Sequence, residues 1–216
     1  ESFSGKNIYL NFNRGGRNFG FDFIYGQNDP TFRADNGFLN NNDKRNFLAN
    51  MFLVVYPNKN WIESLTFYIG HGRNLNMNWD KKGYWTFQMI EGKFIGQTSV
   101  ELMYLSSQEI YQSETFPGLY EVNLSGNTKF GEWIQFGMEL SQSNAIIRFV
   151  DPAVIGKGSG YNGWVAINPG QNLNVNLSIH YSEARDEGGD KYFYKGKLSR
   201  LKVSYQFNRD ISFKTI

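Results

Sequence analysis

The chain has 216 residues, a formal charge of +2 and a mean hydropathy of −0.50, and it contains no cysteine. Disulfides and thiolate metal sites are therefore excluded, and the interspersed 22 basic and 20 acidic residues do not form a nucleic-acid footprint. Since no run of about 18 apolar residues occurs, no transmembrane helix is expected. A membrane β-barrel stays open, because its strands are only half apolar.

Apolar and polar residues alternate at every second position along most of the chain, most clearly in 19–25, 134–141, 173–181 and 200–207. Successive side chains of a strand point to opposite faces, so this period predicts β-strands. Many reach about 10 residues, the length that crosses a bilayer when tilted by about 45°. The twelve predicted strands are 5–14, 17–27, 46–57, 61–72, 83–94, 97–107, 119–128, 132–144, 161–168, 172–183, 193–207 and 211–216.

Three of these strands, 46–57, 83–94 and 161–168, carry apolar residues on both faces, so the pattern does not assign their orientation. The connections are more regular. Short turns are predicted at 15–16, 57–60, 95–96, 129–131, 168–171 and 208–210, and they alternate with longer links at 28–45, 73–82, 108–118, 145–160 and 184–192. Outer-membrane barrels have this order, with tight periplasmic turns and long outer loops.

The tryptophans agree with a membrane position. Trp61 and Trp133 follow short turns, and Trp79 and Trp85 flank a longer link. These are the expected depths of the two interfacial aromatic girdles. Trp164 fits neither girdle.

The faces opposite the apolar rows carry asparagine, serine, glutamine and charges, and burying them unpaired costs about 1–3 kcal/mol each. An aqueous barrel interior removes that cost. The fold class predicted for 1–216 is thus all-β, a transmembrane antiparallel up-and-down β-barrel. The residues predicted to face the interior, as selectivity or plug groups, are Asp22, Glu101, Glu139, His180, Arg200, Lys202 and Lys214.

With the short turns in the periplasm, both ends of the sequence would lie at the outer surface, whereas bacterial barrels begin and end in the periplasm. An open sheet edge is not tolerated in lipid. We therefore expect at least one further strand on each side of 1–216, or a second chain that closes the gap.

Catalytic chemistry has one candidate. His180 could act as a general base in the wall of the barrel, but Ser178 and Ser182, on its own strand, do not form a triad without another strand. His71 falls on the apolar face near Arg73. No catalytic residue is assigned.

Two loop motifs are weaker still. The segment 185–190 has three carboxylates, which Ca²⁺ prefers, without a complete ligand pattern. The segment 156–160 is glycine-rich but lacks phosphate-loop spacing, and we expect a mobile outer loop there. No metal and no cofactor is assigned.

Two patches, 28–39 with the following Asn42-Asp43 and the strand that ends at Tyr56-Pro57, and 198–213, resemble the C-terminal barrel of an uncharacterised family of Bacteroidota outer-membrane proteins. They cover about a fifth of the chain. Members of that family carry an N-terminal domain similar to a family-9 carbohydrate-binding module, and some are labelled membrane-associated hydrolases. The resemblance implies further strands after residue 216, and it places any glycan-binding role outside this chain.

The sequence favours an outer-membrane barrel that acts as a transport or channel element, or as the membrane anchor and scaffold of a surface complex. Its expected partners are the bilayer of the bacterial outer membrane and other surface proteins, with no nucleic acid. Two alternatives stay open: an outer-membrane hydrolase with its site on the barrel wall, and a soluble β-sandwich or lipocalin-like binding domain.

Overall fold

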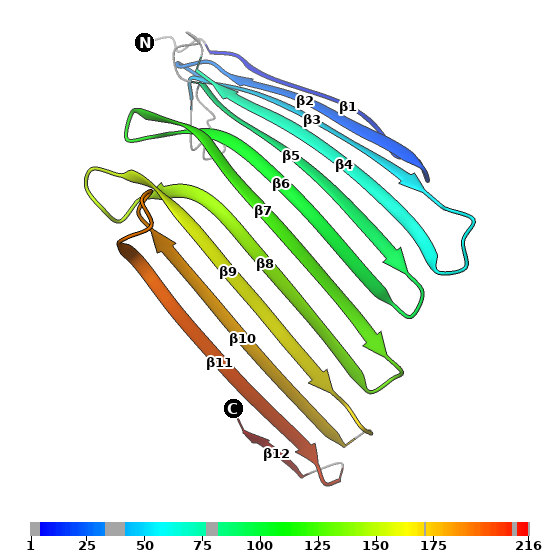
Figure 1. The fold of residues 1–216 in the computed structure, drawn as a ribbon. Helices are drawn as coiled ribbons and strands as arrows, with labels where there is room; N and C mark the ends of the chain where they lie inside the picture. Colours follow the sequence, from blue (N-terminus) through cyan, green and yellow to red (C-terminus); the bar gives the residue numbers. More distant parts are fainter. Residues whose placement is uncertain (1–4, 33–41, 77–81, 171, 209–210, 216) are drawn as a thin grey trace. The chain divides into compact units, whose positions relative to one another are not determined.

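The computed structural model describes residues 5–32, 42–76, 82–170, 172–208 and 211–215. In these residues it contains twelve β-strands and no helix, and the strands follow one another in antiparallel, up-and-down order (Figure 1). The all-β class and the number of strands are therefore confirmed. The strands are β1 (Asn7–Arg14), β2 (Phe19–Asn28), β3 (Lys44–Val55), β4 (Ile62–Leu75), β5 (Lys82–Phe94), β6 (Thr98–Tyr111), β7 (Glu114–Phe130), β8 (Ile134–Ile147), β9 (Val154–Ile167), β10 (Leu173–Arg185), β11 (Tyr192–Gln206) and β12 (Ser212–Thr215).

The strand order begins at β1 and ends at β12, and no pairing joins these two strands in the described residues. The chain divides into two compact units. Unit 1 comprises Glu1–Val55, Thr66–Met89 and Tyr104–Tyr120, and unit 2 comprises Tyr56–Leu65, Ile90–Met103 and Glu121–Ile216. We call the end of the strands that bears the connections β1–β2, β3–β4, β5–β6, β7–β8, β9–β10 and β11–β12 the turn end, and the opposite end the loop end.

In unit 1 the register of β1, β2 and β3 separates two faces. Leu10, Tyr25 and Phe47 lie in one cross-strand row, because Tyr25 pairs with both other residues. Opposite residues of an antiparallel pair share a face, and we call this one the apolar face. Asn13, Asp22 and Asn50 form a row on the other side, which we call the polar face. The register thus assigns β3, whose orientation the sequence left open.

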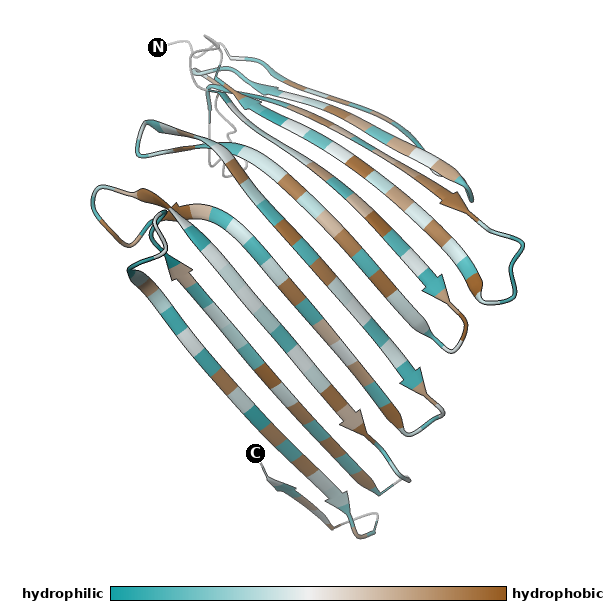
Figure 2. Cartoon of the chain, viewed as in Figure 1, coloured by the Kyte–Doolittle hydropathy of each residue, from teal (hydrophilic) through white to brown (hydrophobic). Residues whose placement is uncertain are grey.

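Unit 2 repeats this separation. Leu177 of β10 pairs with Leu201 of β11 and Val165 of β9, and these residues define its apolar face. Asn176 pairs with Lys202 and Ala166 on its polar face. Figure 2 shows the resulting alternation of hydrophobic and hydrophilic positions along the strands.

The apolar faces are uncovered. Leu177, Met138 and Leu201 are 42%, 50% and 52% exposed, and no large side chain is fully buried in the described residues. The few buried apolar side chains lie near the loop ends of the strands and beside them, and they are Leu75, Phe116 and Leu119 in unit 1 and Ile146, Ile147 and Ala153 in unit 2. The described strands belong to one sheet, in the order β1 to β12.

The prediction of regularly alternating short and long connections is wrong at the β6–β7 connection. Instead of a long link at 108–118, β6 continues to Tyr111 and β7 begins at Glu114. Gln112 and Ser113 form the connection with φ values of 50° and 68°, the left-handed pair that a two-residue hairpin turn requires. Links at this end are shorter than expected because the strands extend further.

The glycine-rich segment 156–160 is also not a loop. It belongs to β9 and pairs with both β8 and β10. A Cβ added at Gly158 or Gly160 would lie 2.8 Å from the hydroxyl oxygen of Ser143 or Ser141. The glycines therefore leave room for serine side chains of β8. In the sequence alone, the same glycine-rich composition is typical of a flexible loop.

Candidate functional site

The polar face of unit 2 gathers six of the predicted interior residues, five of them on β8 and β10 to β12 and the sixth, Glu101, on β6. His180 pairs with Asn162, which pairs with Glu139 on the next strand. On the same face Ser178 pairs with Arg200, and Asn176 pairs with Lys202. Lys214 of β12 pairs with Ser204, two residues after Lys202 on β11, and so lies on this face as well. These charged residues share a face because each lies at the alternate positions of its strand, opposite the apolar row.

Amide side chains connect this face across strands. Asn123 of β7 donates to Oε1 of Glu139 at 2.6 Å, and Asn127 donates to Oγ of Ser99 on β6 at 2.8 Å. Glu101, two residues from Ser99, lies on that same side of β6. Asn174 donates to Asn168, and Asn176 donates to Asn174. The result is a hydrogen-bonded polar surface of the kind that water can wet.

His180 does not form a catalytic pair. It lines a hollow of about 250 Å³ with Glu139, Ser141 and Ser182, but no hydrogen bond links it to a serine or a carboxylate in the described residues. Glu139 is engaged by Asn123. A nucleophile needs a base within hydrogen-bond reach, and this arrangement does not supply one.

His71 lies on the apolar face near the loop end of β4. Its Nδ1 is 2.8 Å from Oγ1 of Thr86, and Arg73 donates to its Nε2 at 3.2 Å. Because Nε2 accepts, Nδ1 carries the proton and donates to Thr86. His71 is thus a hydrogen-bonded link between β4 and β5.

The polar face of unit 1 contains an aromatic ladder that the sequence reading missed. Phe52, Tyr68, Phe87 and Trp85 stack in succession, with ring centroids 5.6, 6.3 and 5.8 Å apart. Glycines lie under the rings, since a Cβ at Gly20, Gly70 or Gly72 would collide with Phe52, Phe87 or Trp85. Asp22 and Asn50 line a hollow of about 350 Å³ with these rings. In the sequence, the glycines on strands next to those that carry the aromatic residues were the signal that could have indicated this ladder.

This ladder places Trp85 on the polar face. It does not share a face with the apolar rows, because its ring rests on Gly72, whose Cβ would lie 2.5 Å from the indole. Trp164 likewise lies on the polar face of unit 2, over Gly137, which explains why it fits neither girdle. Trp79 lies outside the described residues.

Trp61 and Trp133 lie at the turn end of unit 2 and are 57% and 51% exposed. Trp61 stacks on Phe94 with planes 7° apart, and Phe130 stacks on Phe136 beside Trp133. Aromatic side chains therefore gather at this end of the apolar face.

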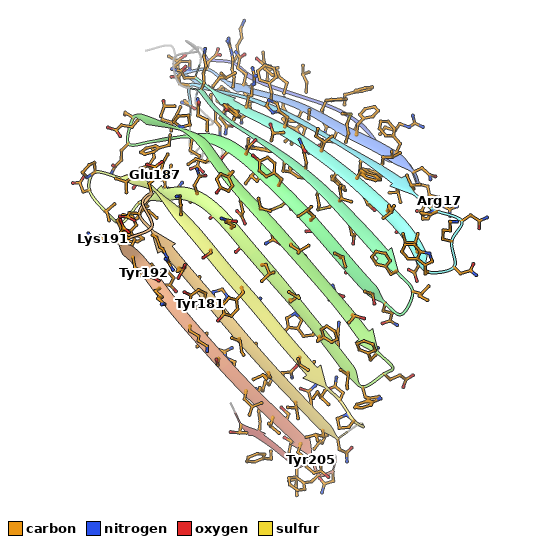
Figure 3. All side chains as sticks on the ribbon, in the orientation of Figure 1. Arg17, Tyr181, Glu187, Lys191, Tyr192 and Tyr205 are labelled. Carbon is orange, nitrogen blue, oxygen red and sulfur yellow. The ribbon has the colours of Figure 1, made fainter. Side chains whose placement is uncertain are left out.

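A second aromatic level lies near the loop end. In unit 2 Tyr161 and Tyr181 stack 4.9 Å apart, and Tyr181 donates to Glu183 two positions further along β10. Nε of Arg185 donates to the same carboxylate at 3.0 Å. Figure 3 shows Tyr181 and Tyr192 near this end and Tyr205 near the opposite end.

Unit 1 repeats the second level with different residues. Tyr25 packs on Phe47 at 5.0 Å, and its hydroxyl donates to Oε1 of Gln27 at 2.6 Å. Nε of Arg45 donates to that same oxygen at 3.2 Å. In both units, then, a tyrosine ends the apolar row, and its hydroxyl group donates to a polar side chain that also accepts a hydrogen bond from an arginine.

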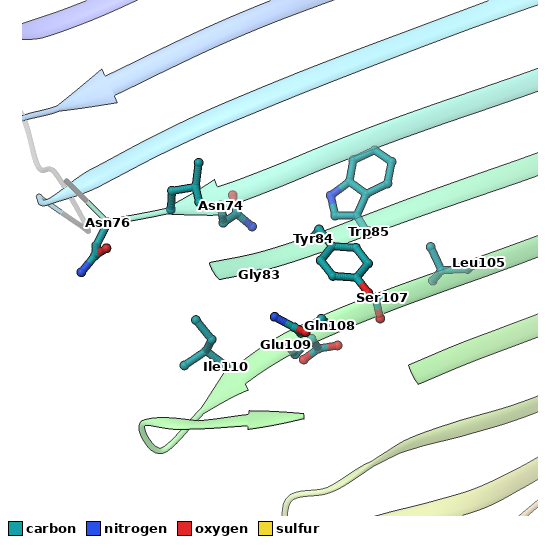
Figure 4. Close-up of a pocket in the computed structure, with 11 residues that line it drawn as sticks. Asn74, Asn76, Gly83, Tyr84, Trp85, Leu105, Ser107, Gln108, Glu109 and Ile110 are labelled. Carbon is teal, nitrogen blue, oxygen red and sulfur yellow. The ribbon is translucent and has the colours of Figure 1, made fainter. Parts of the chain in front are cut away.

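A hollow of about 970 Å³ lies at the loop ends of β4, β5 and β6 in unit 1 (Figure 4). Tyr84, Trp85, Leu105 and Ile110 give it an apolar lining. Gln108 donates to the backbone oxygen of Lys82 at 2.8 Å. The lining residues bring no nucleophile and base together.

Among the described residues, no group of three or more His, Asp or Glu side chains could hold a metal ion. In the 185–190 segment, Asp186 instead closes the β10–β11 connection, accepting from the backbone nitrogen of Lys191 at 3.2 Å. No helix in the described part of the chain is long and apolar enough to cross a membrane. Comparisons with protein families, with curated proteins and with solved structures found no match.

Proposed function

We propose that this chain forms part of the wall of a transmembrane antiparallel up-and-down β-barrel in a bacterial outer membrane, with its apolar faces in contact with lipid and its polar faces lining an aqueous passage. The observation that carries the proposal is the uncovered apolar face with an aromatic level near each end. Leaving one large aliphatic side chain in water forgoes about 1.5–3 kcal/mol, so a face built of such residues needs an apolar environment.

The dimensions support lipid as that environment. In β10 the apolar row runs from Leu173 to Tyr181, and the eight rises of about 3.4 Å between these residues extend about 27 Å along the strand. Membrane strands need about 9–11 residues when tilted. Tyrosine and tryptophan favour the membrane–water interface because one end of the ring is apolar and the other is polar.

The polar face supports a passage for hydrophilic solutes. Arg200, Lys202 and Lys214 gather on β11 and β12 of unit 2, and only Glu139 carries a negative charge in the neighbouring rows of β8 to β10. Charges of one sign on the wall of a pore favour counter-ions. The passage is therefore expected to prefer anions near these strands.

Conductance tests this function. The full chain is reconstituted into a planar bilayer, and the reversal potential is measured in a salt gradient. Discrete channels with anion preference are expected, and R200Q/K202Q/K214Q shifts the preference toward cations. Stable insertion without conductance contradicts the passage and favours the anchor or scaffold function. Failure to associate with any bilayer contradicts the membrane proposal itself.

The hydrolase alternative gains no support from His180, which lacks a serine or acid partner in the described residues. The resemblance to the Bacteroidota barrel family stays a hypothesis, and residues 33–39 of its first patch lie outside the described residues.

A further inference from the structure

The apolar face of unit 2 changes character near the loop end, where four cations gather. Lys157 of β9 pairs with Arg185 of β10, Glu183 pairs with Lys195 of β11, and Tyr181 pairs with Lys197. All of them share the face of Leu177 by strand period. One carboxylate, Glu183, lies among the four positive charges.

The contacts of this cluster leave much of its charge available. Arg185 pairs with Glu183 at 2.9 Å. Tyr192 lies between two cations, with Cζ of Arg185 4.3 Å and Nζ of Lys195 4.9 Å from its ring centroid. Lys157 and Lys197 are exposed and form no ion pair with a carboxylate in the described part of the chain. We call Lys157, Arg185, Lys195 and Lys197 the basic rim.

The basic rim is confined to one end of the strands. At the turn end of β8 to β11 the same face carries Ile134, Ile167, Leu173 and Tyr205 instead. Unit 1 has the same polarity, because Arg45, Arg73 and Lys82 lie at the loop ends of β3, β4 and β5. Strand period places these three on the face of Phe47, Ile69 and Tyr84. Cations therefore lie at the loop end of the apolar face in each unit, and in unit 1 Asp29, which accepts a hydrogen bond from Gln27, lies among them.

We propose that the basic rim binds the phosphate groups of anionic lipid headgroups in the leaflet at the loop end. This inference rests on the proposed membrane function. Lys197 lies level with Tyr181, and the other three cations of the rim lie beyond it. Headgroup phosphates lie at this depth when the aliphatic row is in the acyl chains. Arginine offers a planar pair of donors to a phosphate and lysine offers a compact charge. Tyr192 holds Arg185 and Lys195 in place for this contact.

Spin-labelled lipids test this directly. The full chain is incorporated into phosphatidylcholine vesicles that contain spin-labelled phosphatidylglycerol or spin-labelled phosphatidylcholine, and electron paramagnetic resonance gives the fraction of each label immobilised by the protein. We expect a preference for the anionic label that weakens at high salt. Each cation near a charged surface contributes up to about a fivefold preference, so K157Q/K195Q/K197Q should lower the preference severalfold.

The matched control is R200Q/K202Q/K214Q, which removes three positive charges from the polar face of β11 and β12 and should keep the lipid preference. K157R/K195R/K197R, which keeps the charge, should also keep it, and it separates charge from any effect of the changes on folding. Loss of the preference on replacing chloride with inorganic phosphate at equal ionic strength would overturn the lipid assignment in favour of a free-phosphate site. Equal immobilisation of both labels by the unaltered chain overturns the inference alone, whereas failure to enter either vesicle overturns the membrane function on which it rests.

Discussion

Trp164 of β9 lies across Gly137 of β8, so that a Cβ added at Gly137 would come within 2.7 Å of the indole Nε1. The pair lies on the polar face of unit 2, where the large ring occupies the space that the glycine leaves. The same device recurs in unit 1 with Trp85 over Gly72. Bulky rings on the polar face thus lie flat against the sheet instead of projecting from it.

Gly137→Ala is expected to lower the free energy of unfolding by about 1–3 kcal/mol, because the indole must leave its position. The matched control is Gly163→Ala on the apolar face of β9, where the nearest atom to an added Cβ is 4.0 Å away. Urea titration followed by tryptophan fluorescence in lipid vesicles measures both. Equal stability of the two variants would show that the contact between Trp164 and Gly137 is not tight.

The two faces should respond differently to charge. Leu177→Arg places a cation in the middle of the apolar row and is expected to cost about 2–4 kcal/mol when that row contacts acyl chains. Ser178→Arg, one residue further on the polar face, should cost far less because its side chain reaches water. Equilibrium unfolding from vesicles compares the two, and similar losses would contradict the assignment of the faces.

The β6–β7 turn can be improved. Gln112 and Ser113 both have positive φ. This conformation causes steric strain in residues with a Cβ and none in glycine. Replacing Gln112-Ser113 by Asn-Gly should raise the free energy of unfolding by about 0.4–1 kcal/mol. Glu114→Gly, in the adjacent strand, should instead lower it. Unchanged stability of the Asn-Gly variant would indicate a different turn.

Asp29, which lies beyond the last residue of β2, provides a pH-dependent contact. Nε2 of Gln27 and the backbone nitrogen of Lys6 each donate to its carboxylate at 2.9 Å, and the Gln27 hydrogen bond is the larger cause that holds the pKa of Asp29 below its ordinary value. A lowered folded-state pKa means that this contact stabilises above the unfolded pKa and is lost as pH falls through the folded one. Carboxyl NMR titration in micelles should show a low pKa that Gln27→Ala raises. An unchanged pKa in that variant would exclude the hydrogen bond as its cause.

The sequence predicted the number of strands because alternation is a local property. The faces of β3 and β5 could be assigned only from the cross-strand register, because both faces carry large apolar residues. In β3, Leu48 and Phe52 point to the face opposite to that of Phe47 and Met51. The first half of β9 was missed because its glycines, which serve close packing against β8, are also typical of loops. The start of β7 was hidden by Pro117 and by Gly118, whose φ is +69°.

The candidate sites show the same limit. The predicted interior charges on β8 and β10 to β12 share a face, as strand period requires. The basic rim could not be predicted, because Lys157, Arg185 and Lys195 belong to three strands and meet only through the register of β9, β10 and β11. The aromatic ladder depends in the same way on which glycine lies under which ring.

The most direct test of the central claim uses the absence of cysteine from the chain. Single cysteines are introduced from Asn174 to His180 along β10 and spin-labelled in lipid vesicles, and collision rates are measured with oxygen, which concentrates in acyl chains, and with a water-soluble nickel chelate. We predict that labels at positions 175, 177 and 179 collide with oxygen and those at 174, 176, 178 and 180 with nickel. Nickel collisions at Leu177 equal to those at Ser178, or little access of either reagent to the apolar row, would contradict a lipid-facing sheet.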